Sequence, residues 1–168
     1  MKRHLRIFTL IMLALVALVG GVMMTPAPAL ADGAIQVVGV ATPGDPELCT
    51  DQEGAGYDYI LALDGDLQGC HYGFVDYATC TPSGVYIEAG TETFVGEYKG
   101  QHGTFQTTYK FEAKYKDCPG LVDEVFGRCQ HPIMVGSGKG VFEGVTGRLD
   151  FKDDVVAIEY PYRGHLKF

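Results

Sequence analysis

A two-residue alternation between residues 105 and 116 constrains the fold of this chain more than any other feature of its sequence. The segment FQTTYKFEAKYK has aromatic or small residues at its odd-numbered positions, among them Tyr109 and Phe111, and mostly polar or charged residues at its even-numbered ones. Successive side chains of a β-strand point to opposite faces of the sheet. The pattern therefore predicts a strand with one buried aromatic face and one charged face in water.

Short segments of the same kind recur along the chain, separated by glycine-rich turns. The chain contains 23 glycines. Further strands are predicted over residues 34–40, 57–63, 70–77, 85–94, 128–135, 140–143, 149–158 and 162–167. Gly90 is expected to mark a bulge, and residues 119–127 a loop or a short helical turn. We predict an all-β domain, and favour a small closed antiparallel barrel of about eight strands over an open sandwich, because closure removes exposed edges.

The first 31 residues have the pattern of a cleavable export signal. Three basic residues lie near the start, residues 7–24 are apolar or Gly/Thr, and Ala29-Leu30-Ala31 fits the small-x-small rule for signal peptidase. An uncleaved membrane anchor is the alternative, but two glycines and two prolines interrupt that helix. We expect cleavage after Ala31, which leaves residues 32–168 as one domain secreted to the extracellular space or the cell envelope, without a stable membrane anchor.

The charge of the exported part excludes two classes of partner. Cleavage removes three of the 13 Lys and Arg residues and no acidic residue, so ten basic residues face 21 acidic ones, a net charge of −11. Nucleic acids and anionic lipid surfaces would be repelled by such a protein. No nucleic-acid partner is therefore expected.

All five cysteines lie after the cleavage site, where an oxidising compartment favours disulfides. The short separations suggest the pairs Cys70–Cys80 and Cys118–Cys129, which would leave Cys49 free or linked to another chain. A bridge between Cys70 and Cys129 is equally compatible with the sequence. The sequence does not choose between these pairings.

No motif defines a reaction or a cofactor site. The glycine-rich segment GSGKGVFEGVTG lacks both the βαβ context of a dinucleotide site and the GK[ST] ending of a phosphate-binding loop. Neither serine of the exported part, Ser83 or Ser137, sits in a G-x-S-x-G element. The four histidines after the signal are dispersed without metal-binding spacing, so no metal and no cofactor are predicted. They are His71, His102, His131 and His165.

One polar set on the predicted strand 85–94 has catalytic potential. If this strand is regular, Tyr86, Glu88, Glu92 and Phe94 share a face, whereas a bulge at Gly90 would place the two carboxylates on opposite faces. A glutamate enclosed by an apolar barrel would have a raised pKa and could transfer a proton. A solvated glutamate on the outer wall is the favoured alternative, because glutamate is rarely buried unpaired.

His131 lies two residues from Cys129, on the same face of its predicted strand, so a thiol–imidazole contact is possible. A structural disulfide at Cys129 and a structural role for His131 are the favoured interpretations. Glu88, Glu92 and His131 are the candidate catalytic residues, and Tyr86, Tyr109 and Phe111 the candidate ligand-binding residues.

Several segments in order resemble a known family. The sequences LQGCHYGF, SGVYIEAGTETFVG, GTFQTTYKFEAKY, GRCQHPIMVGSGKGVFEGVTGRLDFKDD and YRGHLKF are similar to those of a bacterial secreted group related to allene oxide cyclase barrels. The G-x-F-x-G-x-T-G-R-x-x-F element resembles dirigent proteins, which share that barrel. The plant cyclase itself resembles this chain at the level of the fold, and none of its catalytic residues is carried over.

The resemblance implies an eight-stranded barrel whose interior can hold a small apolar molecule, in a family whose members include dimers and trimers. We expect a secreted barrel that binds a small hydrophobic ligand or serves as a structural module. The alternative is a cyclase- or isomerase-like enzyme acting on an oxidised lipid or phenolic intermediate. A barrel interior filled by its own side chains would exclude both ligand-based functions.

Overall fold

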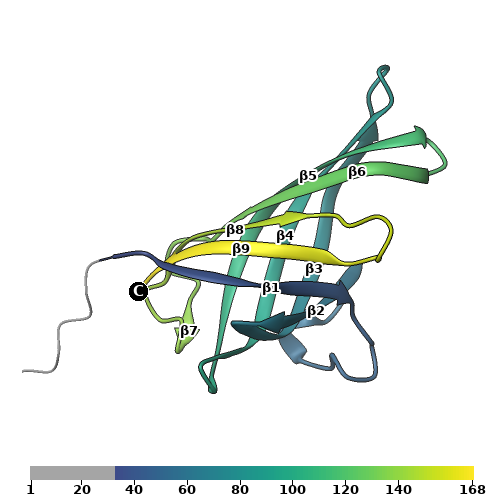
Figure 1. Cartoon of the computed structure of the whole chain (residues 1–168). Helices are drawn as coiled ribbons and strands as arrows, with labels where there is room; N and C mark the ends of the chain where they lie inside the picture. Colours follow the sequence, from purple (N-terminus) through teal and green to yellow (C-terminus); the bar gives the residue numbers. More distant parts are fainter. Residues whose placement is uncertain (1–32) are drawn as a thin grey trace, which may run out of the picture. The chain divides into compact units, whose positions relative to one another are not determined.

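The computed structural model describes residues 33–168, which form a closed, eight-stranded antiparallel β-barrel with one additional short strand (Figure 1). The strands are β1 (Ile35–Pro43), β2 (Tyr59–Gly65), β3 (Leu67–Cys80), β4 (Val85–Tyr98), β5 (Gln101–Asp117), β6 (Val122–Pro132), β7 (Lys139–Gly140), β8 (Thr146–Lys152) and β9 (Tyr160–Lys167). They are hydrogen-bonded in the order β4-β3-β2-β1-β9-β8-β6-β5, and pairing of β4 with β5 closes the barrel. The two-residue strand β7 pairs with β5. The predicted all-β barrel is thereby confirmed.

The strand with the clearest alternation is β5, and the structure confirms its two faces. Phe105, Thr107, Tyr109 and Ala113 are buried, whereas most of the residues between them are exposed. The predicted loop at 119–127 is wrong in part, because β6 already begins at Val122 and pairs with the end of β5. The predicted strand at 149–158 ends early, since β8 stops at Lys152.

Gly90 is not bulged, which corrects the prediction for β4. Pairing between β4 and β5 runs without a shift from Val85 to Tyr98, and the irregularity lies on the neighbouring β3, between Val75 and Tyr77. A Cβ atom at Gly90 would collide with the Phe74 carbonyl and approach the Tyr109 ring. The glycine is therefore needed for close packing, and β4 keeps a strict alternation.

One end of the barrel is sealed and the other extends into two long hairpins. Phe142, in the turn after β7, packs against Phe94 and Phe105 with ring centroids 5.7 Å and 5.0 Å away, and all three rings are fully buried. The β3–β4 and β5–β6 hairpins project from the opposite end (Figure 1). Access to the interior is therefore restricted to the end where these hairpins begin.

A second, smaller apolar cluster lies on the outside of β2, β3 and β4. The segment between β1 and β2, with its 3-10 turn at Gln52–Gly54, covers Tyr72 and Val95 there. The Tyr72 hydroxyl donates to Asp51 Oδ2 (2.8 Å), and a disulfide joins Cys49 to Cys70. Both faces of β3 are consequently buried at His71 and Tyr72.

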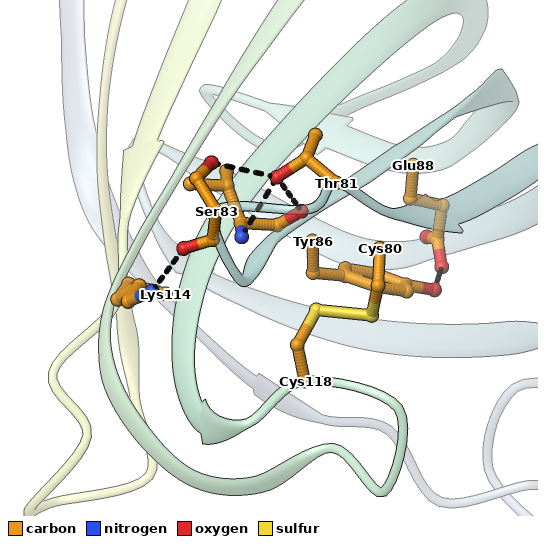
Figure 2. The surroundings of a disulfide bond; sticks show 8 residues. Cys80, Thr81, Ser83, Tyr86, Glu88, Lys114 and Cys118 are labelled. Carbon is orange, nitrogen blue, oxygen red and sulfur yellow. Dashed lines mark hydrogen bonds between the residues drawn. A yellow bond between two sulfur atoms is a disulfide. The ribbon is translucent and has the colours of Figure 1, made fainter.

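The second disulfide joins Cys80, at the end of β3, to Cys118, in the turn between β5 and β6 (Figure 2). Cys129 is free and buried. These pairs correct all three bridges considered from the sequence, and Cys49 is bonded rather than free. Spacing along the chain was misleading because the bridges join segments that are adjacent across the barrel wall. Two disulfides are typical of an oxidising, extracellular-type environment.

The predicted signal peptide at residues 1–31 lies outside the described residues. Within residues 33–168, no helix is long and apolar enough to span a membrane.

Candidate functional site

A cavity of about 310 Å³ occupies the barrel interior at the end from which the hairpins project. Its lining comes from β1, β2, β4, β5, β6, β8 and β9 and is mostly aromatic or aliphatic. The main apolar surfaces are Tyr59, Leu61, Tyr109, Phe111, Phe151 and Tyr160. Glu88, Cys129 and His131 also line it. The cavity is therefore an apolar space with a few polar groups at defined places, the usual character of a small-molecule site.

Glu88 is held between two tyrosines at the cavity wall. Its carboxylate accepts hydrogen bonds from the Tyr86 hydroxyl (2.5 Å; Figure 2) and from the Tyr109 hydroxyl (2.9 Å). Burial, followed by the interaction with Glu88, raises the pKa of both tyrosines, so their hydroxyls remain donors at neutral pH. Because β4 is regular, the first of the two alternatives for this strand holds: Tyr86, Glu88 and Glu92 share a face and all point inward.

Glu92 lies deeper in the barrel and is 1% exposed. Its Oε2 atom lies 2.5 Å from His131 Nδ1 and 3.5 Å from His71 Nε2, and it accepts a hydrogen bond from the Thr107 hydroxyl (2.7 Å). Its Oε1 atom accepts from the Tyr59 hydroxyl (2.8 Å). The outer-wall interpretation is therefore wrong for Glu92: a buried glutamate is acceptable here because four side chains surround its carboxylate.

The protonation of this cluster also differs from the sequence-based expectation. Burial by itself would raise the pKa of Glu92, but the His131 and His71 imidazoles and the hydrogen bonds from His131 and Thr107 outweigh it and lower that pKa to about 2. Burial lowers the pKa of His71 to about 4, although Glu92 opposes the shift. Glu92 is thus a carboxylate and His71 a neutral imidazole at neutral pH.

His131 joins the buried cluster to the cavity. Its ring packs against Phe151, with centroids 4.4 Å apart, and stacks on Tyr109 at 6.1 Å. Its Nδ1 atom faces Glu92, while its Nε2 atom has no hydrogen-bond partner among residues 33–168. The imidazole is therefore oriented through one nitrogen only.

The free thiol of Cys129 lies at the same wall but is not activated. Burial, then repulsion from Glu92, raises the pKa of this thiol well above its usual range. A cysteine nucleophile needs the opposite shift. The thiol–imidazole pair considered from the sequence therefore does not supply nucleophilic chemistry.

Two acids approach each other at the cavity rim. Asp153, just after β8, lies beside Glu124 of β6, because both carboxylates approach the same side of Gly127. Burial, followed by repulsion from these two carboxylates, raises the pKa of the Tyr115 and Tyr160 hydroxyls. Burial, followed by the nearby Glu124 carboxylate, raises the pKa of Asp153 to about 7. An acid whose pKa is raised on folding stabilises the fold most below its unfolded pKa, and this contribution is lost as the pH rises through 7.

We expect Asp153→Asn to be more stable than the wild type at pH 8, by roughly 1 kcal/mol after allowance for solvent screening. At pH 4 the gain should vanish, because the wild-type carboxyl is then protonated. Urea unfolding at the two pH values measures the difference. Asp76→Asn, an exposed change on β3, is the matched control, and an equal effect of both variants would contradict the assignment.

The structure brings the predicted site residues into two connected groups. One group consists of Tyr86, Glu88 and Tyr109, and the other of Glu92 and His131. Phe111 of β5 lines the cavity. Tyr59, His71 and Thr107 were not predicted as partners of Glu92. Alternation places Thr107 and Tyr109 on one face of β5, which was the available signal for Thr107. No sequence pattern marked His71 as an inward-facing residue, because both faces of β3 are buried at His71 and Tyr72, so alternation does not distinguish them.

No protein-family model, curated protein or solved structure matches this chain. The resemblance to allene oxide cyclase and dirigent barrels therefore stays a prediction beyond the barrel fold itself.

Proposed function

We propose that this protein is a secreted barrel that binds one small, largely apolar molecule in the cavity beside Tyr109 and Phe111. The observation that carries the proposal is the cavity itself: about 310 Å³ of space lined mainly by aromatic and aliphatic side chains. A barrel serving only as a structural module needs no such space, since eight strands can be filled by their own side chains.

The polar groups of the cavity favour a ligand with a hydrogen-bonding end. The Glu88 carboxylate accepts from Tyr86 and Tyr109, so it stays paired when the cavity is empty. Its remaining lone pairs can accept a hydrogen bond from a donor group of the ligand. The −11 net charge of the exported chain and the two disulfides suit a protein that works outside the cell. Anionic ligands are disfavoured by Glu88, Glu124 and Asp153 along the wall and rim.

A tryptophan placed in the cavity tests this function directly. The chain contains no tryptophan, so Leu61→Trp fills part of the cavity and introduces a single fluorophore. We expect the wild type to bind an uncharged fluorescent probe, the methyl ester of cis-parinaric acid, at one site per chain. Leu61→Trp should weaken that binding at least about tenfold, because the added side chain occupies the ligand volume.

Val38→Trp is the matched control, since Val38 is 48% exposed on the outer face of β1. It should bind the probe like the wild type. Equal binding by both tryptophan variants, or no saturable binding by the wild type, would contradict a ligand site in this cavity. Mass spectrometry of an organic extract of the protein from its natural source then identifies the ligand.

A cyclase- or isomerase-like activity on an oxidised lipid or phenolic intermediate is the second candidate. His131 favours it, because this imidazole reaches the cavity and is oriented through Nδ1 by a buried carboxylate. A base held by a third group is the usual arrangement for proton transfer. If the protein converts a fatty-acid epoxide, His131→Gln should lower kcat at least about 100-fold, and the exposed change His102→Asn should not. Probe binding without turnover supports the binding function alone.

A further inference from the structure

The buried cluster around Glu92 contains three side chains with the chemistry of metal ligands. His71 comes from β3, Glu92 from β4 and His131 from β6, and all three are at most 2% exposed. One ligand atom from each lies within 4.8 Å of the others. Closure of the barrel brings together residues that are 21, 39 and 60 positions apart in the sequence.

His71 is the least explained member of this cluster if its role is only to fill space. Its side chain is completely buried, and neither ring nitrogen has a hydrogen-bond partner among residues 33–168. Its Nε2 atom lies 3.5 Å from Glu92 Oε2 and forms no hydrogen bond with it. Burying an unpaired polar group costs about 1–3 kcal/mol, and a phenylalanine of similar size would avoid this desolvation cost. The ring packs against Phe94 and Phe151, so the environment is compatible with an apolar residue.

Further side chains donate hydrogen bonds to the carboxylate between the two imidazoles, as is usual for metal-binding carboxylates. Tyr59 donates to its Oε1 atom, and Thr107 donates to its Oε2 atom. Two imidazoles and one carboxylate are the ligands that zinc, cobalt, iron and manganese use in proteins. Calcium and magnesium prefer sites made of oxygen atoms and do not fit this set.

We propose that His71, Glu92 and His131 bind one divalent first-row transition-metal ion inside the barrel. The ion takes the place of the proton between Glu92 and His131. Ligand atoms around such an ion lie about 3 to 3.4 Å apart, given bonds of about 2.1 Å, so these two side chains separate by somewhat under 1 Å on binding. The cavity reaches His131 and supplies an entry path. This inference does not depend on the apolar ligand of the cavity.

The test uses the purified protein without a histidine tag, treated with a chelator and then titrated with Zn²⁺ and Co²⁺. We expect calorimetry to find one tight ion per chain and Co²⁺ to produce the visible absorption bands of a protein-bound ion. Glu92→Gln and His71→Gln should each weaken binding at least about 100-fold. The double variant His102→Asn/His165→Asn removes two exposed histidines and should bind like the wild type.

A measurement on the wild type keeps the test decisive if the core variants fold poorly. Nuclear magnetic resonance of the imidazole nitrogens resolves the individual histidines, and Zn²⁺ should shift those of His71 and His131 while leaving His102 and His165 unchanged. Weak binding of several ions, loss of binding in the exposed double variant, or unchanged signals of His71 and His131 would each overturn the proposal. The cluster would then be a buried hydrogen-bonded network only. The probe-binding experiment does not depend on the metal titration, so the apolar-ligand site and the metal site can be disproved independently.

Discussion

Glu92→Gln should lower the free energy of unfolding by about 3 kcal/mol, measured by urea denaturation in the presence of a metal chelator. Glutamine keeps the size of the side chain and leaves Tyr59 an acceptor. It removes the negative charge that faces His131 and His71, and, with its oxygen facing Tyr59, it places the amide NH2 group near Thr107 and His131. Breaking a buried pair by removing one partner costs about 3–5 kcal/mol, because the groups that faced the carboxylate stay buried without it.

Glu97→Gln provides the matched control for this prediction. Glu97 lies on the same strand, β4, but its side chain is exposed. Its replacement should change stability by less than about 0.5 kcal/mol, as expected for an exposed position. If Glu92→Gln unfolds at the same urea concentration as the wild type, with an unchanged slope, the carboxylate does not occupy the buried position described above.

Removing the Cys80–Cys118 bridge has the second large effect that we expect. The double variant Cys80→Ser/Cys118→Ser should lose about 3 to 4 kcal/mol, since a cross-link that closes a loop of 38 residues restricts the unfolded chain by about that amount. The bridge also ties the β3–β4 hairpin to the β5–β6 turn beside Tyr86 (Figure 2). Circular dichroism should still report a β-sheet protein, because the bridge lies at the end of β3 and in the β5–β6 turn, at the edge of the paired strands.

Cys129→Ala is the control for this experiment, because the Cys129 thiol is free and buried. It should cost much less than the double variant, and the unfolded wild type should react with one equivalent of a thiol reagent per chain. Peptide mapping should recover Cys80 linked to Cys118 and Cys49 linked to Cys70. Recovery of Cys118 linked to Cys129 would contradict the structure and restore the pairing suggested by spacing alone.

The barrel was predictable because it depends on local patterns. Alternation in β5 defines one apolar face, and short segments of the same kind, separated by glycine-rich turns, require neighbours that bury those faces. The errors arose where strands contact each other. The irregularity that we expected at Gly90 lies instead across the ladder, between Val75 and Tyr77 of β3, and no local sequence signal distinguishes these positions.

The buried cluster was only partly predictable for the same reason. Alternation along β4 places Glu88 and Glu92 on one face, but it does not say whether that face points inward. The partners of Glu92 come from β2, β3, β5 and β6, so their identity depends on register and closure. The expected rise in the pKa of a buried glutamate was wrong because these partners were unknown. Local sequence therefore predicts the wall of the barrel, and the chemistry of its interior requires the register.

A crystal structure of the protein tests the central claim most directly, namely that the barrel is hollow at one end and holds the Glu92 carboxylate between two histidines at the base of that cavity. We predict open space or bound ligand density beside Tyr109 and Phe111, with Glu92 between His71 and His131. An interior filled by side chains, or a Glu92 carboxylate in solvent on the outer wall, would contradict it.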